Sequence, residues 1–189
     1  MRYLVVLVVL VVLAYSYYAL GPNKQKQESN IIKNVSSGVI RYGNETLASV
    51  QGNGIVTLDG THVRKSLLVN GSLDANEAHI GNLKVNGQAK INSTVVDGKT
   101  EVNGFLNADK STFQKEVTVS AHKLQFRDCT IDSIVVKKAG WSFGSQVVEL
   151  LDKTICKGSI TFESGDGKII VSDTSQILGA VQGAEVEKQ

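Results

Sequence analysis

The chain has 189 residues and one proline, whereas average usage of about 5% would supply about nine. Its 20 lysines and arginines against 18 aspartates and glutamates leave a net charge of +2, which gives no basic field for nucleic-acid binding. Two cysteines exclude a disulfide-dense scaffold and a zinc site with four thiolate ligands. A hydrophobic fraction of 42% is too high for a disordered chain.

Residues 1–20 predict a segment that enters a membrane. Arg2 is followed by an uncharged run that no soluble β-domain would expose. Two interpretations stay open: a secretory signal peptide cleaved after Ala14-Tyr15-Ser16, or a retained transmembrane anchor. Either one places the rest of the chain in the cell envelope, as a membrane-anchored, periplasmic or secreted protein. The apolar and aromatic residues that mark the membrane segment are Tyr3, Leu4, Leu13, Tyr15, Tyr18 and Leu20.

Residues 21–30 (GPNKQKQESN) are polar, hold the only proline and are typical of a linker. We therefore expect the folded domain to span residues 31–186, followed by a short tail of residues 187–189.

The body of the chain repeats with a period near 17 residues. The tripeptide Val-Asn-Gly begins at Val69, Val85 and Val102, and the same spacing continues to Val119 and Val136. We interpret these five valines as one inward-facing core register. Short apolar pairs recur around them, separated by polar residues, which is typical of short strands. The glycine and the asparagine of the tripeptide are typical of corners that need a positive φ.

Three short strands per period predict an all-β fold, namely a single-stranded, right-handed parallel β-helix with triangular coils of about 17 residues. The scarcity of proline agrees with this, because a proline would remove a backbone donor that pairs with the neighbouring coil. The alternative is a β-sandwich, whose strands would recur at about 8–12 residues without columns at the longer period.

The repeat is less regular in its second half. The second apolar pair moves by one position to Leu124 and Phe126, and the following coil would place Trp141 and Phe143 beside them. Residues 146–153 (QVVELLDK) fit either a short strand or one helical turn.

The two cysteines also allow two interpretations. Cys129 and Cys156 could form a disulfide in an oxidising compartment. Cys129 equally fits a small hydrophobic position that points into the core.

No catalytic, cofactor-binding or metal-binding motif is found. Asp97-Gly-Lys-Thr100 resembles the end of a phosphate-binding loop, but Ser93 stands where that loop needs a glycine. His62, His79 and His122 fall in different coils, without a cysteine or carboxylate at ligand spacing. We therefore expect no metal, no cofactor and no enzymatic activity.

The repeat style resembles that of the bactofilins, a family of bacterial polymer-forming β-helix proteins. The resemblance covers residues 50–183 and rests on coils near 17 residues, corner glycines, few prolines and the closing segments ITFE, GKIIV and ILGAVQG. It implies nucleotide-free filaments that assemble end to end and scaffold the envelope from the cytoplasmic side, some through a short N-terminal membrane segment. This chain differs in its long export-type apolar start, its longer body and its irregular coils around residues 140–155.

The expected function is thus a structural scaffold of the bacterial cell envelope that self-associates through its end coils into a homo-oligomer or filament. The alternative is an exported monomeric β-helix that recognises a glycan or an envelope protein. The expected partners are further copies of the chain and, through the N-terminus, a membrane, but not nucleic acid. An apolar first coil without a capping helix predicts a self-association edge at Ile31, Ile32, Val39 and Ile40.

Overall fold

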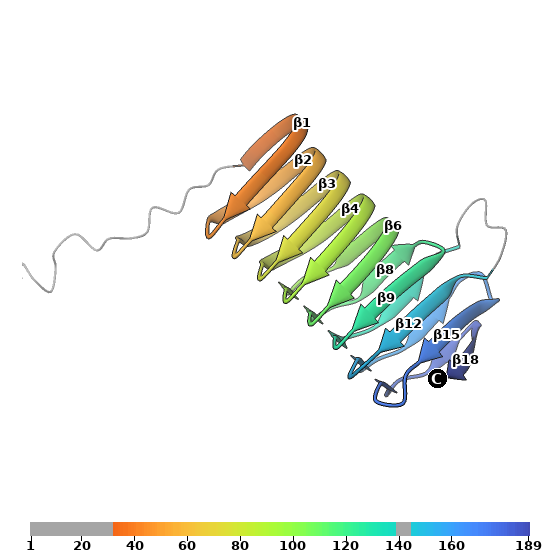
Figure 1. Ribbon diagram of the computed structural model, residues 1–189. Helices are drawn as coiled ribbons and strands as arrows, with labels where there is room; N and C mark the ends of the chain where they lie inside the picture. Colours follow the sequence, from red (N-terminus) through yellow and green to blue (C-terminus); the bar gives the residue numbers. More distant parts are fainter. Residues whose placement is uncertain (1–31, 139–144) are drawn as a thin grey trace, which may run out of the picture.

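The computed structural model describes residues 32–138 and 145–189, with side chains from residue 38 onward. These residues form an all-β parallel solenoid of about nine turns, and no helix occurs among them. Figure 1 shows the coils stacked in chain order, from β1 (Ile32–Gly43) at one end to β18 (Ala184–Lys188) at the other. The β-helix of stacked parallel strands expected from the repeat is therefore confirmed.

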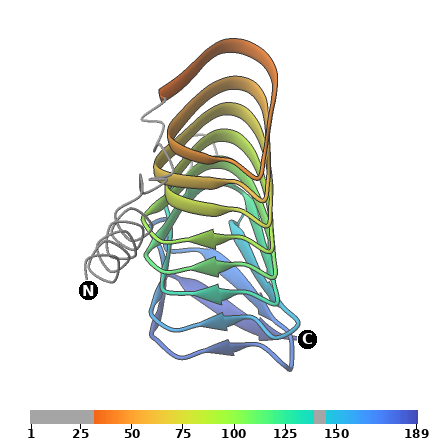
Figure 2. The same cartoon turned by 90° about the vertical axis from the view of Figure 1, so that its left-hand side faces the viewer.

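Each coil has three strand segments, and each segment pairs in parallel with its equivalent in the next coil (Figure 2). We name the three resulting surfaces face A, face B and face C. In the first coils one long strand covers more than one face, and these strands are β1, β2 (Thr46–Asp59), β3 (His62–Asn76), β4 (His79–Asn92) and β6 (Thr100–Asp109).

In the later coils every face has strands of its own. Face A contains β5 (Val95–Val96), β7 (Thr112–Phe113), β10 (Thr130–Ile131), β13 (Ile155–Cys156) and β16 (Gln176–Ile177). Face B contains β8 (Val117–Ser120), β11 (Ile134–Val136), β14 (Ile160–Phe162) and β17 (Val181–Gln182). Face C contains β9 (Lys123–Arg127), β12 (Val147–Leu151), β15 (Gly167–Val171) and β18.

The core consists of alternating residues whose side chains point into the solenoid. On face B the valines of the expected register stack on one another and are fully buried: Val69, Val85, Val102, Val119 and Val136. On face C, Leu124 and Phe126 stack on Leu106 and Ala108 of the preceding coil. Each fully buried side chain of this size stabilises the fold by about 1.5–3 kcal/mol, so the columns together hold the coils in register.

The corner between faces B and C is a column of glycines. Gly54, Gly71, Gly87 and Gly104 lie in register with φ between 123° and 139°, a conformation that only glycine adopts readily. The asparagines before them do not have a positive φ, contrary to expectation. Their side-chain amides instead donate to one another along the stack, over 2.7–2.8 Å, in the order Asn103, Asn86, Asn70, Asn53.

A second corner, between faces C and A, uses hydroxyl groups and left-handed non-glycine residues. Ser93 and Lys110 have φ near 48° and 47° at equivalent positions, and a buried hydroxyl follows each of them. The Thr94 hydroxyl donates to the Asn92 carbonyl over 2.8 Å and accepts from the Ala78 amide over 3.2 Å. The buried hydroxyl thus satisfies backbone groups of both its own coil and the preceding one.

One coil is longer than the others and explains the irregular region of the sequence. β12 pairs with β9 on one side and β15 on the other, so Val148 and Leu150 stack on Leu124 and Phe126. We expected Trp141 and Phe143 to stack on Leu124 and Phe126, but Val148 and Leu150 occupy these register positions. Trp141 and Phe143 themselves lie outside the described residues. Residues 146–153 therefore contain a strand rather than a helical turn.

The expected membrane segment (residues 1–20) and linker (residues 21–30) lie outside the described residues. Within residues 32–138 and 145–189, no helix has the length and apolar character needed to cross a membrane. At the other terminus β18 runs to Lys188 and pairs with β15, so the strands continue past the expected domain end at residue 186 into the expected tail.

Candidate assembly interface

The C-terminal end of the solenoid has an apolar surface. β16, β17 and β18 pair with β13, β14 and β15, and within the described chain none of them has a partner on the opposite side. Ile177, Val181 and Ala184 pack against the core but are only partly buried. Val186 stacks on the fully buried Ile169 and is itself 48% exposed, because no further coil covers it.

The end coil also contains a hollow. Its volume is about 420 Å³, and its lining includes Ile177, Leu178, Val181 and Val186. Leu178 is 64% exposed, the highest exposure among the large hydrophobic side chains of the described chain. The hollow lies where the stack of coils ends, and its lining is mainly apolar but includes Gln176 and Lys188.

Open strand edges are templates for pairing with another chain. On β18, Glu187 faces outward and forms an ion pair with Lys168, whereas Lys188 follows the inward register, stacks on the buried Val171 and lines the hollow. Apart from this lysine at the end of the strand, the end coil offers unpaired backbone groups and apolar surface to a partner. We call β16, β17, β18 and this hollow the C-terminal end face.

Of the residues predicted for the self-association edge, Val39 and Ile40 lie at the opposite end of the solenoid and point to different sides of β1. Ile31 lies outside the described residues, and Ile32 belongs to β1, where it pairs with Ser49. Ile40 is half-buried and packs against the core beside Val56. Val39 is 62% exposed but lies beside Ile55 on the lateral face C. Of the four, only Ile40 is thus shown to contribute to the interior of the first coil.

Two histidines that the sequence placed in separate coils lie in contact. His62 and His79 are register neighbours on face A with ring centroids 4.7 Å apart, and His79 also contacts Asp97 of the following coil. Burial and the nearby His79 lower the pKa of His62 below its usual value. Their separation of one period was the signal that could have revealed this contact. No group of three or more metal-ligating side chains with suitable geometry occurs in the described part of the chain.

The two cysteines are free thiols in the interior and are not joined by a disulfide. Cys156 stacks on Ile131, while the Cys129 amide donates to the hydroxyl of Thr154 over 3.2 Å. Cys129 therefore fills the small inward position next to the hydroxyl corner, which was the second interpretation of its place in the repeat.

Both thiols should resist alkylation in the folded protein. Burial raises the pKa of Cys129 and that of Cys156 to about 11. At pH 8 this leaves roughly a hundredfold less thiolate than an ordinary thiol has, so iodoacetamide labelling measured by mass spectrometry should be slower by at least that factor than in urea. Labelling of either cysteine at the unfolded rate would contradict the burial. Absence of labelling in urea without reductant would instead reveal a disulfide.

A comparison with models of protein families, with curated proteins and with solved structures finds no match to this chain.

Proposed function

We propose that this protein is a structural scaffold of the bacterial cell envelope that self-associates through its end coils, as the bactofilins do. The observation that carries the proposal is the C-terminal end face, where open strand edges lie beside a mainly apolar hollow of about 420 Å³. A stack of coils has a natural way to grow, because a second copy can continue the backbone pairing that ends at β18.

Association of two copies through the C-terminal end face would be stabilised by two contributions. Pairing with a further strand satisfies the unpaired backbone groups of β16, β17 and β18. Covering Leu178, Val186 and the hollow removes apolar surface from water at about 25 cal/mol per Å². If two copies join C-terminal end to C-terminal end, the interface is isologous and the product is a dimer; growth into a filament requires the N-terminal coil as well.

The N-terminal segment gives this scaffold its proposed location. The uncharged residues between Arg2 and Lys24 would tether or export the solenoid, and residues 21–30 would separate it from the membrane. The proposed partners are therefore other copies of the chain and the membrane itself.

The test is the oligomeric state of the purified full-length protein in detergent, measured by light scattering and negative-stain electron microscopy. We expect at least dimers at tens of micromolar. Val186→Lys should weaken the association by at least about tenfold, because it places a charge in the apolar interface. A strictly monomeric protein would overturn the proposal and favour the monomeric binding module.

Lys99→Glu is the matched control. Lys99 is exposed at a lateral corner far from the C-terminal end face, so this charge change should leave association unchanged. Both variants should keep the β-rich circular dichroism spectrum of the parent protein. An equal effect of the two substitutions would show that association follows net charge rather than the end face.

A further inference from the structure

Face C carries a row of polar side chains that have no partner among the described residues. Asp74, Lys90 and Asn107 stand at equivalent positions of consecutive coils, in register and pointing outward. Asp74 and Lys90 are direct neighbours with opposite charges, yet they form no ion pair, and Gln88 and Asn107 make no side-chain hydrogen bond. These four groups are available to a ligand.

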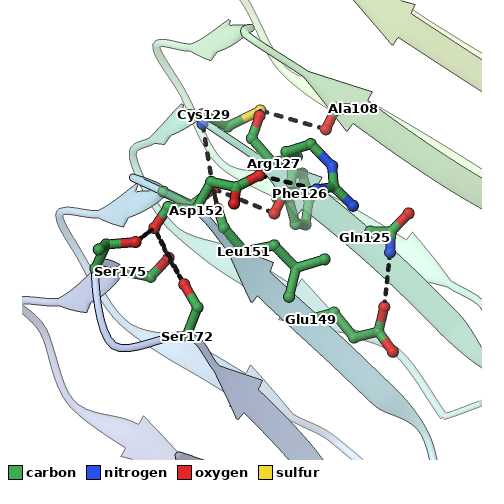
Figure 3. Close-up of polar contacts among 12 residues, drawn as sticks. Ala108, Gln125, Phe126, Arg127, Cys129, Glu149, Leu151, Asp152, Ser172 and Ser175 are labelled. Carbon is green, nitrogen blue, oxygen red and sulfur yellow. Dashed lines mark hydrogen bonds and ion pairs between the residues drawn. The ribbon is translucent and has the colours of Figure 1, made fainter. Parts of the chain in front are cut away.

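The same face behaves differently in the following coils. Gln125 donates to Glu149 over 2.9 Å, and Arg127 pairs with Asp152 at 2.9 Å (Figure 3). Glu149 also forms an ion pair with Lys123 at 2.7 Å. The side chains of β9 and β12 are thus satisfied within the protein. The contrast locates unused hydrogen-bonding capacity on the face C segments of β3, β4 and β6.

The unpaired row lies in a shallow groove. One part has a volume of about 560 Å³ and is lined mainly by amides and charged groups, including Asn76, Asn92 and Asp109. The second part, of about 350 Å³, shares Asp74, Lys90 and Asn107 with the first and adds Phe105 and Ile55. Phe105 is 42% exposed, so a flat aromatic surface stands beside the polar row.

We propose that this groove binds a neutral linear polysaccharide that runs along the solenoid axis. Sugar hydroxyls both donate and accept hydrogen bonds, so they match a row that alternates carboxylate, ammonium and amide groups. The apolar face of a sugar ring can pack against Phe105 in the same way as other apolar groups pack against aromatic rings. Successive coils lie about 4.8 Å apart, which is close to the advance of one ring in an extended polysaccharide.

Charge and backbone geometry favour this ligand over two others. Lys90 and Arg127 are balanced by Asp74 and Asp109 in the lining of the groove, so there is no excess positive charge to hold a polyanion. An extended peptide binds a sheet by adding a strand to an open edge. Face C offers no such edge in these coils, because the backbone of β4 already pairs with β3 and β6.

The test is saturation-transfer difference NMR of soluble hexasaccharides, cellohexaose and chitohexaose, with the purified full-length protein. This measurement follows the ligand and works whether the protein is a monomer or an assembly. We expect transfer to at least one of the two sugars. Phe105→Ala and Lys90→Ala should each weaken binding by about five- to tenfold, because they remove the packing surface and a hydrogen-bond donor.

Thr118→Ala is the matched control, since Thr118 is an outward residue in the middle of face B and its loss should leave binding unchanged. Light scattering of the same samples should show unaltered association, which separates this proposal from the scaffold proposal. Absence of transfer to both hexasaccharides would overturn the inference. So would an equal loss in the Thr118 variant, or transfer to a hexagalacturonate or a hexapeptide in place of the neutral sugars.

Discussion

Val85→Asp should unfold the central coils or destabilise the protein by more than about 4 kcal/mol. Val85 is fully buried on face B between Val69 and Val102 of the neighbouring coils. A carboxylate at this position would have no water, cation or hydrogen-bond donor from a side chain within the core column. The change should appear as a large fall in the midpoint of thermal unfolding, measured by circular dichroism.

The control is the preceding residue, which points to the other side of the sheet. Lys84 is exposed and pairs with Glu101 at 2.8 Å. Lys84→Gln should cost less than about 1 kcal/mol, because exposed ion pairs contribute little. If the outward change destabilised the protein more than the inward one, the register would be wrong by one residue.

Gly87→Ala is expected to destabilise the solenoid by more than about 3 kcal/mol. Gly87 has φ of 139°, and a Cβ added there would lie 2.1 Å from the carbonyl oxygen of Gly71. That oxygen belongs to the backbone of the adjacent coil, so the clash can be relieved only if the two coils separate. Urea unfolding of the variant and the parent protein measures the difference.

Gly43→Ala provides the comparison for the same chemical change. A Cβ at Gly43 would have only the carbonyl oxygen of Asp59 nearby, at 3.9 Å, and its φ is not in the left-handed region. The alanine should be tolerated within about 1 kcal/mol. A similar loss at both positions would mean that the glycine column at the corner has no special role.

The sequence alone was enough to predict the β-helix and its core register. Every coil must bury similar side chains against the coils above and below it, so the chemical requirement recurs at each coil and leaves a visible period. The valines from Val69 to Val136 carried that signal because one inward column accepts only apolar residues. The corner glycines were visible for a similar reason, since the backbone approaches its neighbour too closely for a Cβ.

Other features depend on which residues become neighbours in adjacent coils, and the repeat period predicted these features wrongly or not at all. The long coil before β12 shifts the pairing partner of Leu124 from residues near 141 to Val148, and a fixed repeat length cannot anticipate this shift. Side-chain contacts between neighbouring coils were also not predicted from the sequence. His62 and His79 meet only because two residues one period apart are placed side by side.

The sequence therefore determined what points inward, because burial imposes the same apolar requirement on every coil. The tertiary structure decided what the surface offers. Whether Lys90 pairs with Asp74 or remains available depends on side-chain geometry across coils, not on spacing. Whether an apolar residue such as Val186 is core or interface depends on whether another coil covers it. Both are properties of neighbours in space, which composition and periodicity do not specify.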